Sequence, residues 1–264
     1  MLQFTSTSIL VDTRRATKNL LWYHPDEQKE FKKDKHLVDL KYLQSDIYYT
    51  FNKEGYRSKN FEDVENEFVL IFGCSHSEGI GLHEEDIWCN QLCNRIGIDR
   101  INLGKSGTGP DIQYINSLQY IKNNYLRPKL VVIQWPQTFR RSFAYTKRNG
   151  PLRLKRNIVL QHHNVNSKKE KQDTDWFLNR YCGGDTAEMF MNNYIAFNAT
   201  NMLWNSVNVP VYNWSWTGDF EFNDERIKMV ETEHTGYARD MMHDGTDIHT
   251  QVVDQIYKNV NKML

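Results

Sequence analysis

Residues 67–79 read EFVLIFGCSHSEG, and this stretch decides the fold. The five residues 68–72 form a continuous apolar run that ends at Gly73, which is typical of a strand buried on both faces of a parallel sheet. Ser75 follows in a tight turn, and an expected helix comes after it. A short strand that turns into a helix begins a βαβ unit, so the stretch predicts an α/β fold.

The alternation of strands and helices continues along the chain. Further short apolar strands are expected at residues 100–103, 130–133 and 209–214. Helical patterns cover about 85–95, 110–126, 186–206 and 247–263. This order favours right-handed crossovers and a parallel sheet. We therefore predict a three-layer α/β/α, flavodoxin-like fold with a central, mostly parallel five-stranded sheet.

The chain has 264 residues, which suits a single α/β domain with insertions. Residues 1–66 are polar, aromatic-rich and weakly patterned, so we expect an N-terminal lead-in packed on the core and not an independent domain. Residues 67–264 are expected to form the main domain. Within it, a polar and basic stretch at about 139–185 has little periodicity, and we interpret it as an insertion that covers the binding edge.

Composition excludes several classes of function. Lysine plus arginine and aspartate plus glutamate both total 33, so the net charge of zero gives no attraction to nucleic acid or to an anionic membrane. No apolar run approaches the roughly 18–20 residues of a membrane span, and the N-terminus does not resemble a secretory signal. We expect a cytoplasmic protein, or a virion protein if the Asn- and Lys-rich composition reflects a viral source.

Cysteine usage argues against a disulfide framework. The four cysteines, at positions 74, 89, 93 and 182, form no disulfide framework and no CxxC metal pattern. Cys89 and Cys93 are four residues apart in an expected helix and share a face, so a metal pair is the less favoured alternative. Buried free thiols in a reducing compartment are the expected state. We predict no cofactor.

Residues that can carry chemistry follow the expected strands, where ligands bind in open α/β sheets. Ser75 follows the first strand, and its N–H would lie where a developing oxyanion is stabilised. The segment NLGKSG (102–107) follows the second strand, and its glycines would let the backbone approach a substrate. Near the C-terminus, Asp240 stands three residues before His243. An Asp so placed can orient the imidazole through Nδ1 while Nε2 faces a serine, as in a Ser-His-Asp triad.

In these three segments the chain resembles the SGNH (GDSL-like) hydrolase family. GCSHSEGIGL (73–82) resembles the first block, with Ser75 at the nucleophile position, and NLGKSG resembles the second, with Gly107 as the oxyanion-hole glycine. DMMH resembles the last block, with Asp240 and His243 as the dyad. The resemblance covers residues 67–264 in order. It implies a serine hydrolase that cleaves an ester, with an O-acetyl or other short acyl group on a carbohydrate as the expected substrate.

Two positions depart from the family pattern. Cys74 stands where the family usually has Asp, and Pro136 stands about where it has an oxyanion-hole Asn. Gln134 or Gln137 could supply a side-chain amide in its place, and the sequence does not choose between them. Loss of one oxyanion donor typically costs ~10²–10³ in rate. A catalytically weak or inactive binding or structural protein with the same fold therefore remains the alternative.

Several other residues have both a functional and a structural interpretation. His76 could line the pocket or lie exposed in a turn, Arg140 could bind an anionic substrate group or form a salt bridge in the insertion, and Trp216 could reach the cleft or belong to the core. Ser77 is a rival serine that we expect to cap the helix, and Cys74 is a less favoured nucleophile.

A metal site is the alternative interpretation of four residues near the C-terminus, which are His243, Asp244, Asp247 and His249. Surface histidines near a helix N-terminus, with Asp247 as the N-cap, are the commoner explanation, so we predict no metal. The sequence gives no oligomeric state.

Overall fold

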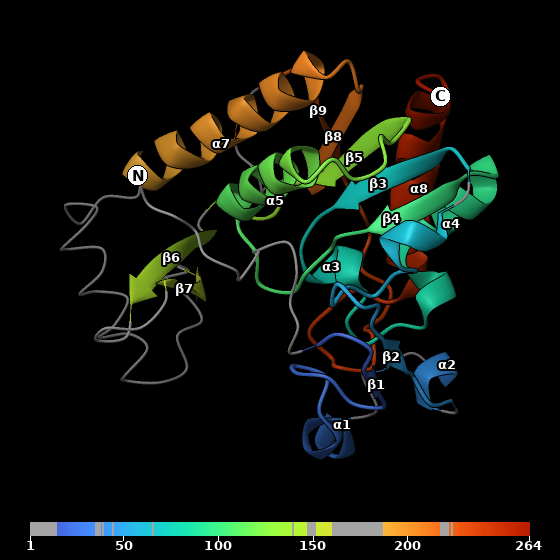
Figure 1. The fold of residues 1–264 in the computed structure, drawn as a ribbon. Helices are drawn as coiled ribbons and strands as arrows, with labels where there is room; N and C mark the ends of the chain where they lie inside the picture. Colours follow the sequence, from blue (N-terminus) through green and yellow to red (C-terminus); the bar gives the residue numbers. More distant parts are fainter. Residues whose placement is uncertain are drawn as a thin grey trace.

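The computed structural model describes residues 15–34, 38, 40–43, 45–64, 66–138, 140–146, 152–159, 187–216, 222 and 224–264. Its centre is a five-stranded sheet (Figure 1) built from β3 (Phe68–Phe72), β4 (Asp99–Asn102), β5 (Leu130–Gln134), β8 (Val211–Trp216) and β9 (Ile227–Val230). The strand order is β4-β3-β5-β8-β9, and every neighbouring pair is parallel.

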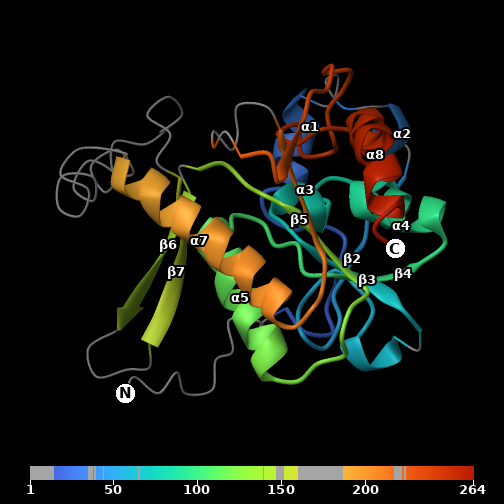
Figure 2. The ribbon, with the colours of Figure 1, turned by 90° about the horizontal axis from the view of Figure 1, so that it is seen from above.

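Helices cover both faces of this sheet (Figures 1 and 2). One face carries α4 (Trp88–Ile96) and α8 (Thr246–Asn261), and the other carries α5 (Pro110–Lys122) and α7 (Ala187–Ser206). Alternate residues of β3 serve the two sides, because Val69 and Ile71 pack with α4 and α8 while Leu70 and Phe72 pack with α5 and α7. This double burial explains the continuous apolar run. The predicted three-layer fold is confirmed.

The described part of the N-terminal lead-in contributes to both cores. It contains β1 (Asn19–Leu20) paired antiparallel with β2 (Tyr49–Thr50), the helices α1 (Gln28–Asp34) and α2 (Leu40–Leu43), and a 3-10 turn η2 (Phe61–Asp63). Tyr49 and Phe51 are buried with the α4 and α8 side, and Tyr56 and Phe61 with the α5 and α7 side. The boundary at residues 66 and 67 stays a prediction.

The insertion holds a two-stranded hairpin that the sequence did not predict. Strands β6 (Arg140–Thr146) and β7 (Leu152–Val159) pair antiparallel, with a register shift between Arg141 and Phe143. The rest of the expected insertion, including His162, His163 and Cys182, lies outside the described residues.

The boundaries of other elements differ modestly from the expected ones. Strand β8 begins at Val211 and not at Val209, with the carbonyl of Pro210 accepting the N–H of Val131. Helix α8 begins at Thr246 with Gly245 at the N-cap position, so the expected cap, Asp247, lies in the first turn. A helix long and apolar enough to cross a bilayer is absent from the described part of the chain.

Candidate active site

The turn after β3 carries the predicted nucleophile. Helix α3 (Ser75–Glu78) begins at Ser75, which is 4% exposed. The first N–H groups of a helix have no acceptor within it. In the described part of the chain, no residue accepts a hydrogen bond from the N–H of Ser75 or of Gly107. Both groups are therefore available to a ligand.

Gln134, at the end of β5, supports this turn with hydrogen bonds. Its side chain is fully buried, and its Oε1 accepts the N–H of Cys74 at 3.2 Å and the hydroxyl of Ser77 at 2.9 Å. Ser77 also accepts the indole N–H of Trp88 at 3.2 Å. Ser77 lies inside α3, so the expectation that it caps the helix is wrong. These bonds hold the Gln134 side chain against the nucleophile turn. Gln137, the other expected donor, is half-buried.

The Asp240–His243 dyad is formed. Asp240 Oδ2 lies 2.5 Å from His243 Nδ1, and Asp240 Oδ1 accepts the backbone N–H groups of Met242 at 3.2 Å and His243 at 3.1 Å. An ionised carboxylate only accepts, so it favours the tautomer with the proton on Nδ1, and in that neutral tautomer Nε2 has the lone pair. The Asp240 side chain has no exposure and that of His243 is 12% exposed, so the buried carboxylate fixes an imidazole that can still reach a ligand.

Glycines bring the nucleophile turn against the other two blocks. At Gly81, a Cβ would lie 2.8 Å from Ala238 Cβ, 2.9 Å from the N of Arg239 and 3.0 Å from the N of Asp240. Gly81 also has a φ of +76°, in the left-handed region that favours glycine. Gly104, in the second block, would place a Cβ 2.6 Å from Ser77 Cβ. The three segments therefore meet at the carboxyl edge of the sheet because there is no side chain between them.

Ser75 and His243 do not share a hydrogen bond. The Ser75 hydroxyl makes one weak contact, to Cys74 Sγ at 4.0 Å. Among the described aromatic contacts, the ring nearest to His243 is that of His76, the residue after Ser75, with ring centroids 5.1 Å apart. The structure thus brings Asp240 and His243 together and places the turn of Ser75 beside them, without a hydrogen bond between Ser75 and His243.

Two further histidines, His76 and His249, lie near the dyad and are neutral at pH 7. Burial, with smaller contributions from His243, His249 and Arg140, holds the pKa of His76 well below its ordinary value. Burial, together with His243, lowers the pKa of His249 to about 3. His249 is 1% exposed, and its Nδ1 accepts the backbone N–H of Trp88 at 2.9 Å. The expectation of a surface histidine at this position is therefore wrong.

The expected substrate-binding residues gather around His76. Trp216 packs on it with ring centroids 4.5 Å apart, and Arg140 is close enough for its charge to act on the His76 ring. Trp216 and Arg140 are both half-buried. Asp244 lies on the same side, with Oδ2 3.7 Å from His76 Nδ1, and burial raises its pKa.

No cluster of three or more His, Cys, Asp or Glu side chains among the described residues is arranged to hold a metal ion. Cys74, Cys89 and Cys93 are buried free thiols. Burial raises the pKa of Cys89 to about 12, so this thiol stays protonated at neutral pH.

Three groups that support the site were not predicted from the sequence. They are Gln134 in its supporting role, the ion pair of Asp26 and Arg239, and Glu78. Glu78 Oε2 accepts the backbone N–H of Ser106 at 2.5 Å. The position of Arg239 directly before Asp240 was the one available signal. Nothing in the local sequence of Asp26 connects it with a site more than 200 residues away.

Comparison with known proteins gives fold-level likenesses only. No protein-family model and no curated protein match the chain. A lipolytic protein of the G-D-S-L family from Desulfitobacterium hafniense aligns over 75% of this chain and 100% of its own, with 11% identity and a TM-score of 0.41. An esterase from Pseudoalteromonas sp. aligns over 74% and 100%, with 13% identity and a TM-score of 0.39. An acetyl xylan esterase from Butyrivibrio proteoclasticus aligns over 76% and 64%, with 9% identity and a TM-score of 0.40.

Proposed function

We propose that the protein is a serine ester hydrolase in which Ser75 is the nucleophile, His243 the general base and Asp240 the residue that orients the imidazole. The observation that carries this proposal is the dyad, with Asp240 Oδ2 2.5 Å from His243 Nδ1 beside the turn that begins α3. A carboxylate that fixes the Nδ1 tautomer leaves Nε2 free to accept a serine proton, which is the role of the pair in a triad.

The reaction would follow two acyl-transfer steps. His243 Nε2 takes the Ser75 proton as Oγ attacks the ester carbonyl carbon, and the resulting oxyanion accepts the free N–H groups of Ser75 and Gly107. His243 then returns the proton to the leaving alcohol oxygen, and an acyl-serine remains. Water, activated by the same imidazole, hydrolyses the acyl-serine and regenerates Ser75. Two backbone donors supply the oxyanion hole in this scheme, and Gln134 or Gln137 as a third donor stays a prediction.

Catalysis requires Ser75 Oγ to leave Cys74 and turn toward His243. Its present contact, 4.0 Å from a thiol, is too weak to hold it. Catalytic hydrogen bonds are often long or absent without substrate and tighten when it binds. A bound ester carbonyl, held by the N–H groups of Ser75 and Gly107, would favour the productive rotamer.

The resemblance of the three sequence blocks to SGNH hydrolases supports an O-acetyl or other short acyl ester of a carbohydrate as the substrate. His76, Arg140 and Trp216 are proposed to contact it. Arg140 suits an acidic group on that substrate, since no carboxylate within the described residues pairs with it at ion-pair distance and its buried Nε has no hydrogen-bond partner.

Hydrolysis of p-nitrophenyl acetate tests the proposal. The wild type is expected to hydrolyse the ester above background, and Ser75→Ala and His243→Ala are each expected to lose at least ~10³-fold in kcat. Ser206→Ala is a matched control, because this exposed hydroxyl bonds only the carbonyl of Leu203 in its own helix. Equal rates in the wild type, Ser75→Ala and His243→Ala would exclude the triad.

A non-catalytic binding protein is the second candidate, and the absence of a Ser75–His243 hydrogen bond favours it. This candidate predicts that acetylated oligosaccharides raise the melting temperature of the wild type without being hydrolysed. It also predicts that His243→Ala does not change the initial rate of p-nitrophenyl acetate release.

A further inference from the structure

A buried ion pair joins the N-terminal lead-in to the block that carries the dyad. Arg239, which directly precedes Asp240, is 2% exposed, and Asp26 is fully buried. Arg239 Nη2 and Nε donate to Asp26 Oδ2 at 2.6 and 3.0 Å. Arg239 Nη2 also donates to the carbonyl of Leu21 at 2.6 Å. The guanidinium carbon lies 3.9 Å from the centroid of the Trp22 ring, so the lead-in surrounds Arg239.

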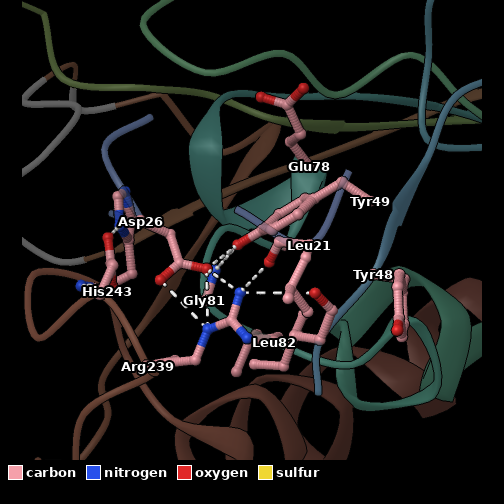
Figure 3. Close-up of polar contacts among 12 residues, drawn as sticks. Leu21, Asp26, Tyr48, Tyr49, Glu78, Gly81, Leu82, Arg239 and His243 are labelled. Carbon is pink, nitrogen blue, oxygen red and sulfur yellow. Dashed lines mark hydrogen bonds and ion pairs between the residues drawn. The ribbon is translucent and has the colours of Figure 1, made fainter. Parts of the chain in front are cut away.

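The same carboxylate connects to the loop that follows the nucleophile turn (Figure 3). Tyr49 donates its hydroxyl proton to Asp26 Oδ2 at 2.6 Å and accepts the N–H of Gly81 at 2.7 Å. The carbonyl of Gly81 in turn accepts the backbone N–H of Arg239 at 3.0 Å. Asp26, Tyr49, Gly81 and Arg239 thus form a closed circuit, which we call the clamp, and His243 is drawn beside it.

The stability of the fold does not by itself account for the clamp. Burying two charges costs solvation energy, and well-packed apolar residues of similar volume often stabilise a protein as much or more. A buried, fully hydrogen-bonded ion pair does fix one geometry, because each partner loses most of its interactions if it moves. The geometry fixed here is the position of Arg239, one peptide bond from Asp240, relative to Gly81 in the nucleophile loop.

We propose that Asp26, Tyr49 and Arg239 are positioning residues of the hydrolytic site, through which the N-terminal lead-in holds the Asp240–His243 dyad against the nucleophile turn. This inference rests on the proposed function. It makes the lead-in a working part of the site, although none of its described residues is in hydrogen-bond contact with Ser75 or His243.

The charges of the clamp also act on the dyad. Burial raises the pKa of Asp26, whereas the hydrogen bonds from Arg239 and Tyr49 lower it. The negative charge of Asp240 also raises it, so the two carboxylates act on one another. Removing the Asp26 charge leaves Arg239 uncompensated and disfavours the imidazolium of His243. Removing the Arg239 charge leaves Asp26 uncompensated and favours that imidazolium.

The other groups that face His243 keep the same charge in these variants. They are Asp240 and Asp244 in its own loop, His76 on α3 and His249 on α8. His234 acts on Asp244 from further along the chain, with Nδ1 3.5 Å from Asp244 Oδ1. Burial keeps His76 and His249 neutral near pH 7. Asp26→Asn and Arg239→Gln are therefore expected to move the acid limb of the kcat/KM profile in opposite directions, to lower and to higher pH respectively.

The experiment combines kinetics on p-nitrophenyl acetate with proton NMR of the imidazole N–H shared by His243 and Asp240. A short His–Asp hydrogen bond gives a far-downfield proton resonance, which Asp240→Asn identifies by removing it. Asp26→Asn is expected to broaden that resonance and to lower kcat at least tenfold with KM unchanged. Asp224→Asn, in the surface pair with Arg226, is the matched control and should change neither.

Tyr49→Phe keeps the test open if Asp26→Asn does not fold, because it removes only the hydroxyl that joins Asp26 to Gly81. It is expected to broaden the resonance and lower kcat to a smaller extent. An unchanged resonance and unchanged kcat in a folded Asp26→Asn or Tyr49→Phe protein would overturn the inference. A wild type that shows the resonance but no hydrolysis would instead refute the proposed function, and the NMR comparison would still decide the role of the clamp.

Discussion

Replacing Gly81 with alanine tests the close approach between the nucleophile loop and the dyad block. The added methyl group would lie 2.8 Å from Ala238 Cβ and 2.9 Å from the backbone N of Arg239. Neither neighbour is the end of a flexible side chain, so the backbone itself must move. Gly97 offers a matched control, since its φ of +77° equals that of Gly81 within a degree and an added Cβ there would meet nothing within 4 Å.

The two substitutions share one cost and differ in another. An alanine in the left-handed region costs about 1–2 kcal/mol, and the loss of unfolded-state freedom returns about 0.4–1 kcal/mol. Gly97→Ala should therefore destabilise the protein by about 1 kcal/mol. Gly81→Ala adds the steric cost of overpacking, typically about 1–3 kcal/mol, which gives a total of about 2–4 kcal/mol.

Urea denaturation at pH 7 measures both free energies of unfolding, and p-nitrophenyl acetate hydrolysis measures the effect on the site. Because the methyl group presses on the N of Asp240, kcat in Gly81→Ala is expected to fall about 10²-fold, while Gly97→Ala keeps the wild-type value. Equal losses of stability in the two variants, with equal kcat, would refute the close approach.

Three other substitutions have defined outcomes. Gln134→Leu leaves the N–H of Cys74 without its acceptor, so urea denaturation should show a loss of about 1–3 kcal/mol. Asp240→Asn should keep the fold by circular dichroism and lower kcat by about 10⁴-fold, because the imidazole loses its orienting carboxylate; an unchanged kcat would exclude the dyad. Burial lowers the pKa of His249 to about 3 in the folded protein. Below about pH 6.5, His249 therefore binds a proton in the unfolded chain but not in the folded one. Stability should therefore fall as the pH drops from about 6.5 toward 3, by up to ~1.4 kcal/mol per pH unit, and His249→Gln should reduce this slope.

The strands that are buried on both faces were predictable because their signal is local. The run 68–72 is apolar at every position since both faces of β3 are covered, and the first four residues of β5 repeat this pattern. Strand β9 was missed because it has only four residues, lies at the edge of the sheet and directly follows the charged residues Asp224, Glu225 and Arg226 in the sequence. The hairpin of β6 and β7 was missed because its residues carry many charges and alternate between apolar and basic only over the short stretch 152–155.

The dyad was predictable, and its surroundings were not. Asp240 and His243 are three residues apart, so one short segment contains the whole interaction. The direction of the Gln134 amide depends on the partners that the nucleophile turn presents, and sequence offered it as an oxyanion donor. The clamp depends on contacts between residues 26 and 239, and such long-range pairs leave no periodic signal in a single sequence.

Labelling by a fluorophosphonate probe tests whether Ser75 is an activated nucleophile, because the probe reacts with activated serines. We expect one phosphonylated residue, Ser75, identified by mass spectrometry of the wild type at neutral pH. We also expect loss of labelling in His243→Ala and retained labelling in Ser206→Ala. An unlabelled wild type, or labelling of Ser75 that persists unchanged in His243→Ala, would contradict the proposed triad.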